Sequence, residues 1–269
     1  MVHMDVKLEA LYRILSLHQP GIIAVSGGVD SSFLAAVAKT WGFDYQTVFL
    51  GGPHLSPREQ EEAEDLIPNL GLPYVIGKFS PLEVPQAAAN GHARCYHCKT
   101  ALIQTLKKYA HPWRGQVLDG SHQEDATEYR PGRRALEEQG VVSPLAEAEM
   151  AKKDIRTQAR ALGLEQADQP SRPCLMTRFG YGYAMSAREL LNVGRAEDEL
   201  RRIGLNLFRI RFPARGGVLL HIHQSQEDWV RHRQPAITQC MEQAGFSSFS
   251  LELVPKLSGY FDQVSPTFT

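Results

Sequence analysis

The stretch that decides the fold is "AVSGGVDSS", residues 24–32. It ends an apolar run that reads as a strand, and it opens "DSSFLAAVAKTWG", whose apolar residues recur at helical spacing. A strand, a glycine turn and a helix in this order present the N–H groups of the loop and of the helix N-terminus to an anion. Gly27 and Gly28 let the backbone approach that anion closely. The alternative for the two glycines is a plain turn between strand and helix.

The side chains of this loop favour phosphate with a metal ion. Ser26 and Ser31 add hydroxyl donors, and Asp30 adds a carboxylate that is unfavourable beside phosphate unless a cation such as Mg²⁺ shares the site. The spacing matches neither of the common glycine-rich phosphate motifs, G-x-x-x-x-G-K-[ST] and G-x-G-x-x-G. We therefore predict a phosphate loop of a different type.

Working outward from this loop, strand-like and helix-like segments alternate as far as about residue 165. This alternation predicts an α/β fold with a parallel sheet covered by helices on both faces. Ligands of such sheets bind at the carboxyl ends of the strands. Strands are expected at 45–50, 73–77 and 116–120, and helices at 56–71, 98–110 and 151–164.

The remainder predicts a smaller α+β module. Helices are expected at 186–204 and 226–245, the second interrupted at Pro235, with strands at 207–213, 218–224 and 249–254. We place a nucleotide-binding domain at 1–170 and a substrate or oligomerisation domain at 184–269.

Composition narrows the class of protein. The formal net charge is −1, with 29 basic against 30 acidic side chains, which gives no support for a protein that coats nucleic acid. It leaves open a small anionic substrate held by a few arginines. We see no signal peptide and no apolar run long enough to span a membrane, so we expect a cytoplasmic protein. Four cysteines in such a chain favour ligand or catalytic roles over disulfides.

Two of these cysteines lie in "RCYHCK", residues 94–99. The spacing of Cys95 and Cys98 lets both thiols reach one metal, but a closed zinc site needs two further ligands. Cys174, in "SRPCLMTR", stands between two arginines that favour a thiolate, although a packed loop cysteine is the alternative. Nearby histidines, His92 and His97, keep a zinc site of three cysteines and one histidine open.

Several basic residues are candidates for anion binding. Arg209 and Arg211 stand two apart on an expected strand, so both guanidiniums can face one anion, unless they simply cover a solvated face. Lys99 and Lys152 could neutralise phosphate charge or be surface lysines. Arg130, in "YRPGRR", is a further candidate in a loop.

"SGGVDS" resembles the loop of the ATP pyrophosphatases, or PP-loop enzymes, which adenylate a substrate and release pyrophosphate. Together with "RCYHCKTAL", "DGSHQED", "PCLMTRFGYG" and "FRIRFP", it resembles the LarE-type sulfur transferases over most of the chain. The resemblance implies a transferase that uses ATP and Mg²⁺. It assigns nucleotide binding to Ser26, Gly27, Gly28, Asp30, Ser31 and Asp119.

The same resemblance bears on the cysteines and the substrate. Some members of the family surrender the sulfur of one cysteine, and others hold a [4Fe–4S] cluster with three. The resemblance therefore implies a cluster on Cys95, Cys98 and Cys174, with Cys174 and Asp30 as catalytic residues. It also implies a homo-oligomer and a small phosphorylated carboxylate substrate, a pyridinium nucleotide if the family substrate applies. Its candidate contacts are Arg130, Arg178, Arg209 and Arg211.

Two departures concern the substrate more than the chemistry. His122 replaces an Asn expected in the loop 119–125, and the strand 218–224 carries His221 and His223 where the family tends to place an acid. Three alternatives stay open: an enzyme that thiolates tRNA, an amide-forming ligase that uses ammonia, and a nucleotide-binding protein without catalysis. The ligase would not explain the three cysteines.

Overall fold

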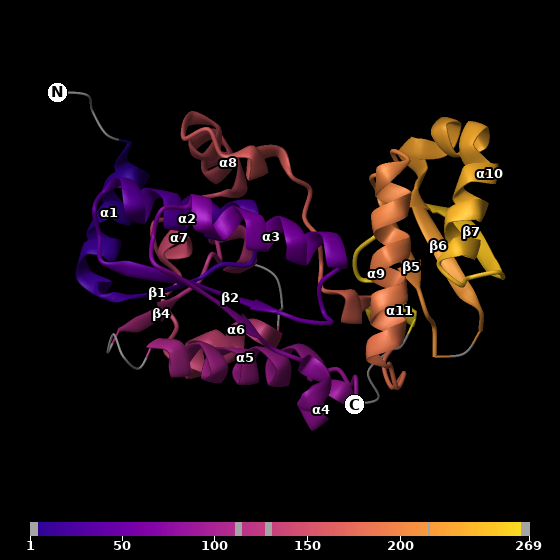
Figure 1. Cartoon of the computed structure of the whole chain (residues 1–269), viewed down its shortest axis with the longest axis horizontal. Helices are drawn as coiled ribbons and strands as arrows, with labels where there is room; N and C mark the ends of the chain where they lie inside the picture. The colour runs from indigo at the N-terminus through magenta and orange to yellow at the C-terminus, as the bar shows by residue number, and fades with distance from the viewer. Residues whose placement is uncertain (1–4, 111–114, 127–130, 215, 265–269) are drawn as a thin grey trace. The chain divides into compact units, whose positions relative to one another are not determined.

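A computed structural model of the chain describes residues 5–110, 115–126, 131–214 and 216–264 (Figure 1). The chain forms two compact units. Unit 1 comprises Met1–Gly52, Glu59–Phe79 and Cys95–Arg172, and unit 2 comprises Pro53–Arg58, Ser80–Arg94 and Pro173–Thr269. Unit 2 thus draws on two early segments that the sequence did not assign to it. The proposed domain limits, 1–170 and 184–269, stay a prediction.

Unit 1 is built on a parallel sheet in the order β3-β2-β1-β4. Its strands are β1 (Gly21–Ala24), β2 (Tyr45–Gly51), β3 (Tyr74–Lys78) and β4 (Gln116–Leu118). The central strand β2 is buried along its whole length, as expected for a strand covered on both faces. The predicted α/β fold with a parallel sheet is confirmed and is compatible with a PP-loop domain.

Helices cover both faces of this sheet, with α2 on one side and α5 and α6 on the other (Figure 1). They pack because apolar residues of α2, such as Phe33 and Leu34, and of the sheet, such as Ile23 and Phe49, are buried away from water. The helices are α1 (Val6–His18), α2 (Val29–Thr40), α3 (Pro57–Asn69), α5 (Arg94–Ala110), α6 (Pro131–Glu138), α7 (Pro144–Glu147) and α8 (Lys152–Ala161).

Unit 2 contains a three-stranded sheet in the order β5-β6-β7. Strand β5 (Phe208–Arg211) runs antiparallel to β6 (Val218–His223), and β7 (Phe249–Val254) runs parallel to β6. The helices of this unit are α4 (Pro85–Ala88), α9 (Ala187–Arg202), α10 (Glu227–Gln243) and α11 (Tyr260–Val264). Short 3₁₀ turns in the chain are η1 (Pro81–Glu83), η3 (Gln123–Ala126), η4 (Glu165–Asp168), η5 (Leu175–Arg178) and η6 (Gln224–Gln226).

Helix α10 corrects one expectation. It runs through Pro235 without interruption, because Val230 before the proline and Ile237 and Met241 after it bury the same face in the core. Cys240 lies on this face and is 6% exposed, so it belongs to the core.

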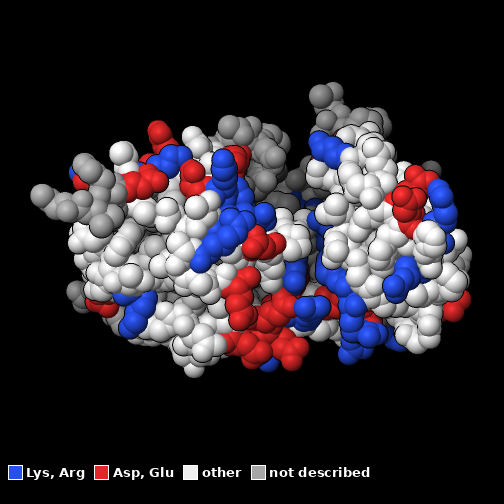
Figure 2. Space-filling model, turned by 90° about the horizontal axis from the view of Figure 1, so that it is seen from above, with Lys and Arg blue, Asp and Glu red and all other residues white. Residues whose placement is uncertain are grey.

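None of the described helices is both long and apolar enough to cross a bilayer. On the face drawn in Figure 2, basic and acidic side chains are interspersed. This mixture agrees with the near-zero net charge.

Candidate functional site

The loop between β1 and α2 is held in shape by its own hydroxyl groups. The Oγ of Ser31 accepts a hydrogen bond from the backbone N–H of Ser26 at 3.1 Å and lies 3.2 Å from the Oγ of Ser26. Gly27 has a φ of +80°, and a Cβ there would lie 2.9 Å from the Cβ of Ala63. Glycine is therefore required at Gly27 for both conformation and space. The loop opens directly into α2, whose N-cap is Gly28.

Asp30, in the first turn of α2, is paired with Lys152, the first residue of α8. The Nζ of Lys152 lies 2.7 and 2.5 Å from the two carboxylate oxygens of Asp30. The sequence suggested a metal ion as the cation beside this carboxylate. In this structure a lysine supplies the positive charge, and both side chains keep partial contact with solvent.

Asp119 directly follows β4 at the carboxyl edge of the sheet and is buried. Its carboxylate accepts hydrogen bonds from the Oγ of Ser121 at 2.7 Å and the Oγ of Ser143 at 2.8 Å. The Nζ of Lys99 lies 3.8 Å from one of its oxygens. These contacts fix the orientation of a carboxylate that the sequence predicted for nucleotide binding.

The two loops are in direct contact. A Cβ on Gly120 would lie 2.8 Å from the backbone nitrogen of Ser31, so the residue after Asp119 packs against the start of α2. Both loops follow the carboxyl ends of strands, the edge at which ligands of parallel sheets bind.

His122, which replaces the expected Asn, also lies at the carboxyl edge of the unit 1 sheet. Its Nδ1 lies 3.2 Å from a carboxylate oxygen of Glu124, and that oxygen accepts a hydrogen bond from the backbone N–H of Lys152 at 2.9 Å. His122 and Glu124 therefore connect the loop after β4 to the start of α8. Arg130, a predicted substrate contact, lies outside the described residues.

Cys95 and Cys98 lie within the first five residues of α5, and Lys99 follows Cys98 directly. Cys95 is exposed and Cys98 is half-buried. Residues four apart share a helix face, so Cys95 lies on the face of Lys99, whose Nζ reaches Asp119. Within unit 1, Lys99 therefore connects the face of α5 that carries Cys95 to the loop of Asp119.

Cys174 belongs to unit 2, where it precedes η5 and packs against the apolar core. Its carbonyl accepts hydrogen bonds from the backbone N–H and the Oγ1 of Thr177. Among the described residues, no three His, Cys, Asp or Glu side chains form a ready-made metal site. A shared site on the three cysteines therefore stays a prediction.

The two arginines that flank Cys174 in sequence both have carboxylate partners. Arg172 contacts Glu62 at 2.6 Å. Arg178 is 1% exposed and donates two hydrogen bonds, of 2.6 and 2.9 Å, to Glu197, which is fully buried. Burial alone would raise the pKa of Glu197, but Arg178 and then Arg201 lower that pKa to about 2. The role of Arg178 in substrate binding is untested, and its ion pair favours a structural one.

The arginines of β5 differ in accessibility. Arg209 and Arg211 alternate with the core residues Phe208 and Ile210, so they share one face of the strand, as their spacing predicted. Arg211 is 5% exposed and donates hydrogen bonds to the carbonyls of Thr177 and Leu257. Burial, with Arg178 and Arg209, lowers its pKa to about 10. Arg209 is half-buried.

The acid missing from strand 218–224 comes from its neighbour. His221 of β6 is paired in register with Glu252 of β7, and the Nε2 of His221 lies 3.2 Å from a carboxylate oxygen of Glu252. The sequence alone does not reveal this contact, because it depends on β7 running parallel beside β6. Burial lowers the pKa of His221, although Glu252 opposes this shift.

Comparison with known proteins identifies the relatives of this chain. No family model matches it. Uncharacterized protein slr1717 of Synechocystis is 37% identical over 210 residues, which cover 77% of this chain and 78% of that protein. The pyridinium-3,5-bisthiocarboxylic acid mononucleotide synthase of Lactiplantibacillus plantarum is 29% identical over 215 residues, 79% and 78% of the two chains. The chain belongs to a LarE-like family. Uncharacterized protein MJ0830 of Methanocaldococcus jannaschii is 29% identical over 191 residues, 71% and 73% of the two chains.

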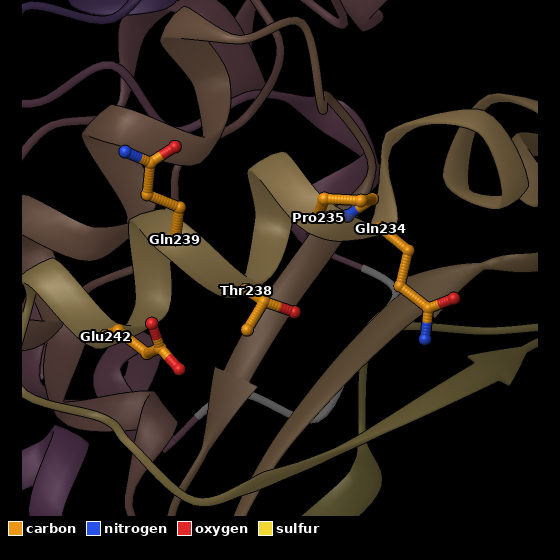
Figure 3. A pocket seen from close by; sticks show the side chains of 5 residues that line it. All are labelled: Gln234, Pro235, Thr238, Gln239 and Glu242. Atoms are coloured by element: carbon orange, nitrogen blue, oxygen red, sulfur yellow. The ribbon is translucent and has the colours of Figure 1, made fainter.

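Membership of a LarE-like family supports an enzyme of the transferase class that handles sulfur. An open pocket along α10, lined by Gln234, Pro235, Thr238, Gln239 and Glu242, contains none of the predicted site residues (Figure 3). Its five side chains come from one helix and include one ionisable group, Glu242. For this LarE-like protein, the carboxyl edge of the unit 1 sheet is the stronger candidate for the nucleotide site.

Proposed function

We propose that this LarE-like protein is an ATP-dependent sulfur transferase that adenylates a substrate carboxylate and replaces AMP with sulfur. One observation carries the proposal: the loop of Ser31, the loop of Asp119 and the helix of Cys95 meet at one edge of a sheet. Gly120 packs on the nitrogen of Ser31, and Lys99 connects the carboxylate of Asp119 to the helix that carries the thiols. A phosphate loop beside paired cysteines is suited to a reaction that combines ATP with sulfur.

In this proposal, the backbone N–H groups at the start of α2 bind the triphosphate of ATP. Asp30 and Asp119 supply carboxylate oxygens, the ligands that Mg²⁺ prefers. Because Lys152 occupies both oxygens of Asp30, binding of Mg²⁺ there would release the lysine. Lys152 could then neutralise charge on a phosphate group, as could Lys99.

The reaction has two steps. A carboxylate oxygen of the substrate attacks the α-phosphorus of ATP, the bond to the β-phosphate oxygen breaks, and pyrophosphate leaves. A hydrosulfide then attacks the acyl carbon and loses its proton, the bond to the AMP oxygen breaks, and a thiocarboxylate remains. Attack by the thiolate of Cys174 would instead give a thioester, which releases a thiocarboxylate only when the α-proton of Cys174 is removed and its Cβ–Sγ bond breaks, leaving dehydroalanine. Positive charge from Lys99, Lys152 and the metal would stabilise the phosphate oxygens in the first step.

The cysteines fit a [4Fe–4S] cluster in their chemistry, because thiolates are the ligands of such clusters and three of them leave one iron without a protein ligand. Cys95 and Cys98 would hold the cluster from α5, and Cys174 from the segment before η5. When bound, the cluster would supply an iron site for an additional sulfide. Zinc with one histidine, or a Cys174 that gives up its own sulfur, are the competing hypotheses.

For the substrate, we propose a small phosphorylated carboxylate. The name of the L. plantarum relative describes synthesis of a pyridinium mononucleotide with thiocarboxylic acid groups. A pyridinium nucleotide is therefore the first substrate to test. Arg209 is the candidate contact for its phosphate, because it is half-buried, whereas Arg178 and Arg211 are buried. A cytoplasmic homo-oligomer stays a prediction.

Two measurements test the function. Exchange of labelled pyrophosphate into ATP should require a carboxylate acceptor and Mg²⁺, and release of ADP instead would contradict adenylation. Anaerobically purified protein should contain iron and sulfide. Stoichiometric zinc in colourless protein after anaerobic reconstitution would exclude the cluster.

A further inference from the structure

The end of the chain covers Arg211 of β5. After β7, a short link and helix α11 form a strap, residues 255–264, that belongs to unit 2 together with β5. The carbonyl of Leu257 accepts a hydrogen bond from the Nη2 of Arg211. The ring centroids of Tyr260 and Phe261 lie 5.6 and 5.4 Å from its guanidinium carbon. The strap therefore contributes to the burial of this arginine, which is 5% exposed.

Arg211 is a buried cation without a carboxylate partner. In the described part of the chain, none of the carboxylates lies within 4 Å of its guanidinium nitrogens. Its Nη1 donates to the carbonyl of Thr177 at 3.1 Å, which is a neutral acceptor like the carbonyl of Leu257. Burial and the positive charges of Arg178 and Arg209 lower its pKa. A buried cation in such surroundings is stabilised when an anion binds it.

The guanidinium edge that the strap meets is the edge that binds anions with two hydrogen bonds. Arg178 shows the arrangement, because its Nε and Nη2 donate to the two carboxylate oxygens of Glu197, at 2.6 and 2.9 Å. In Arg211 the same edge is only half used. Its Nη2 donates to the carbonyl of Leu257, and its Nε is buried without a hydrogen-bond partner among the described residues. An anion with two oxygens would satisfy both nitrogens.

A second arginine lies beside this edge. Arg209 is two residues before Arg211, shares its face of β5 and is half-buried. A phosphate group held by Arg209 could gain both nitrogens of Arg211 only if the carbonyl of Leu257 moves away. The strap and the anion therefore compete for the same donor.

Few contacts attach the strap to the rest of unit 2. Phe261 packs on Gly180, where a Cβ would lie 3.2 Å from the ring, and the exposed Asp262 accepts a hydrogen bond from the Oη of Tyr181 at 2.6 Å. Among the described residues, no backbone–backbone hydrogen bond joins the strap to the unit. Gly259, directly before α11, has a φ of +73°. Segments with few buried contacts open at a low cost in free energy.

We propose that the strap is a lid over a phosphate site formed by Arg209 and Arg211, and that it opens when the phosphate group of the substrate binds both arginines. The proposal rests on the proposed function for the identity of the ligand, a small phosphorylated carboxylate. Because the closed strap excludes the phosphate from Arg211, it lowers the apparent affinity by the fraction of protein that is closed. The lid lies within unit 2, so it can be tested without ATP, sulfide or metal.

Hydrogen–deuterium exchange of the full-length protein measures the opening. Nicotinate mononucleotide, a phosphorylated pyridinium carboxylate, is the probe, and nicotinate riboside, which lacks the phosphate, is its matched control. Peptides within 255–263 should exchange faster when the nucleotide is added, and peptides of β5 should not. A ligand usually protects the segments that it contacts, so faster exchange confined to the strap indicates a lid. Unchanged or slower exchange of the strap with the nucleotide, or equal acceleration by the riboside, would overturn the proposal.

Loosening the strap should raise the affinity for the nucleotide. Phe261→Ala removes the ring that packs on Gly180, so less of the protein is closed and binding should tighten about tenfold. Gln263→Ala changes an exposed residue of the same helix and should leave the affinity unchanged. Isothermal titration measures both variants. Binding to Phe261→Ala that is no tighter than binding to the wild type would contradict a lid.

Two further variants keep the test decisive if Phe261→Ala does not fold. In Gly259→Ala the new Cβ meets no atom closer than 3.9 Å, but the φ of +73° disfavours alanine, so the closed strap alone is destabilised and the affinity should rise about fivefold. An unchanged affinity in this variant would count against the lid.

Arg211→Gln should abolish the acceleration of strap exchange by the nucleotide, whereas Arg202→Gln, which removes an exposed arginine of unit 2, should preserve it. Acceleration that persists in Arg211→Gln would also overturn the proposal. Failure of the proposed function appears separately, as wild-type protein without pyrophosphate exchange, and does not alter the exchange of the strap.

Discussion

The Nζ of Lys152 binds both carboxylate oxygens of Asp30, at 2.7 and 2.5 Å. The acid at the start of α2 and the base at the start of α8 thus neutralise each other across 122 positions of sequence. If ATP arrives with Mg²⁺, the metal and the lysine compete for the same oxygens. The pair is therefore the first place to test the proposed nucleotide site.

Asp30→Ala should abolish pyrophosphate exchange, because it removes a proposed metal ligand. Lys152→Met should reduce turnover about 10- to 100-fold, which corresponds to the loss of one charge-assisted contact to phosphate of about 1.5–3 kcal/mol. It should also lower the Mg²⁺ concentration needed for half-maximal ATP binding, since the competing cation is gone. Isothermal titration of ATP at several Mg²⁺ concentrations measures this effect.

Lys107→Met is the matched control, since Lys107 is an exposed lysine of α5 that contacts Gln139. It should leave exchange and ATP binding unchanged. An unaltered Mg²⁺ dependence in Lys152→Met would show that the lysine and the metal do not compete.

The two glycines of the phosphate loop should respond differently to alanine. Gly27→Ala combines a φ of +80° with a Cβ 2.9 Å from that of Ala63, so it should destabilise the fold by about 1–3 kcal/mol. At Gly28, φ is −83° and the nearest atom to a new Cβ is the Oγ of Ser26 at 3.6 Å. Gly28→Ala should therefore fold normally and lose ATP affinity only.

Chemical denaturation and ATP titration of the two variants test this difference. Equal losses of stability would mean that the loop adopts another conformation. Normal ATP affinity in a folded Gly28→Ala protein would indicate that the phosphates do not approach this glycine.

Glu197 should make the stability of the protein depend on pH below 4.5. Its pKa is lowered from 4.5 to about 2 in the folded state, so the carboxylate stabilises the fold above pH 4.5. This contribution, about 3 kcal/mol, is lost as the pH falls from 4.5 through 2. Urea denaturation of the wild type across this range should show the loss, and Glu197→Gln should not.

At neutral pH, Glu197→Gln should cost about 3–5 kcal/mol, because it leaves Arg178 buried without its charge partner. Glu199→Gln removes the carboxylate of the exposed pair with Arg202 and should change the free energy of unfolding little. A Glu197→Gln variant as stable as the wild type would show that the pair does not support the fold.

The local pattern of the sequence predicted most of the secondary structure of unit 1, but few of the ion pairs. Each strand of the parallel sheet follows from a short apolar run beside an amphipathic helix, and the meeting of Ser31 with Gly120 follows from the geometry of parallel strands. The burial of Arg178 could not be predicted, because its partner Glu197 comes from a different helix. The interruption expected at Pro235 was wrong because core packing outweighed one lost hydrogen bond.

The contacts between the strands of unit 2 could not be predicted from the sequence either. The pairing of His221 with Glu252 depends on β7 lying parallel to β6, and no local signal in the sequence distinguishes that order from an antiparallel one. The burial of Arg211 could not be predicted for the same reason. Its spacing from Arg209 predicted an accessible face, but its guanidinium is covered by Tyr260, Phe261 and the carbonyl of Leu257. Tertiary contacts from distant segments decided these positions.

The cysteines give the prediction that separates the sulfur mechanisms. Cys95→Ser, Cys98→Ser and Cys174→Ser should each eliminate sulfur transfer, because a cluster needs all three thiolates. Each should leave the affinity for ATP intact, since the phosphate loop is built from other residues. Cys240→Ala is the control: it removes a buried thiol of α10 and should lower stability while sulfur transfer continues.

The intact mass of the wild-type protein then shows which sulfur moves. With an external sulfide source, a cluster mechanism returns every cysteine unchanged, so the mass should stay constant through repeated turnovers. A sacrificial mechanism converts Cys174 to dehydroalanine, which is lighter by one H₂S, and it has no need of two further thiols at metal-binding spacing. Because Cys95 and Cys98 are both present near the start of α5, we expect no loss of mass. Loss of H₂S that maps to Cys174, with transfer unaffected in Cys95→Ser, would exclude the cluster mechanism.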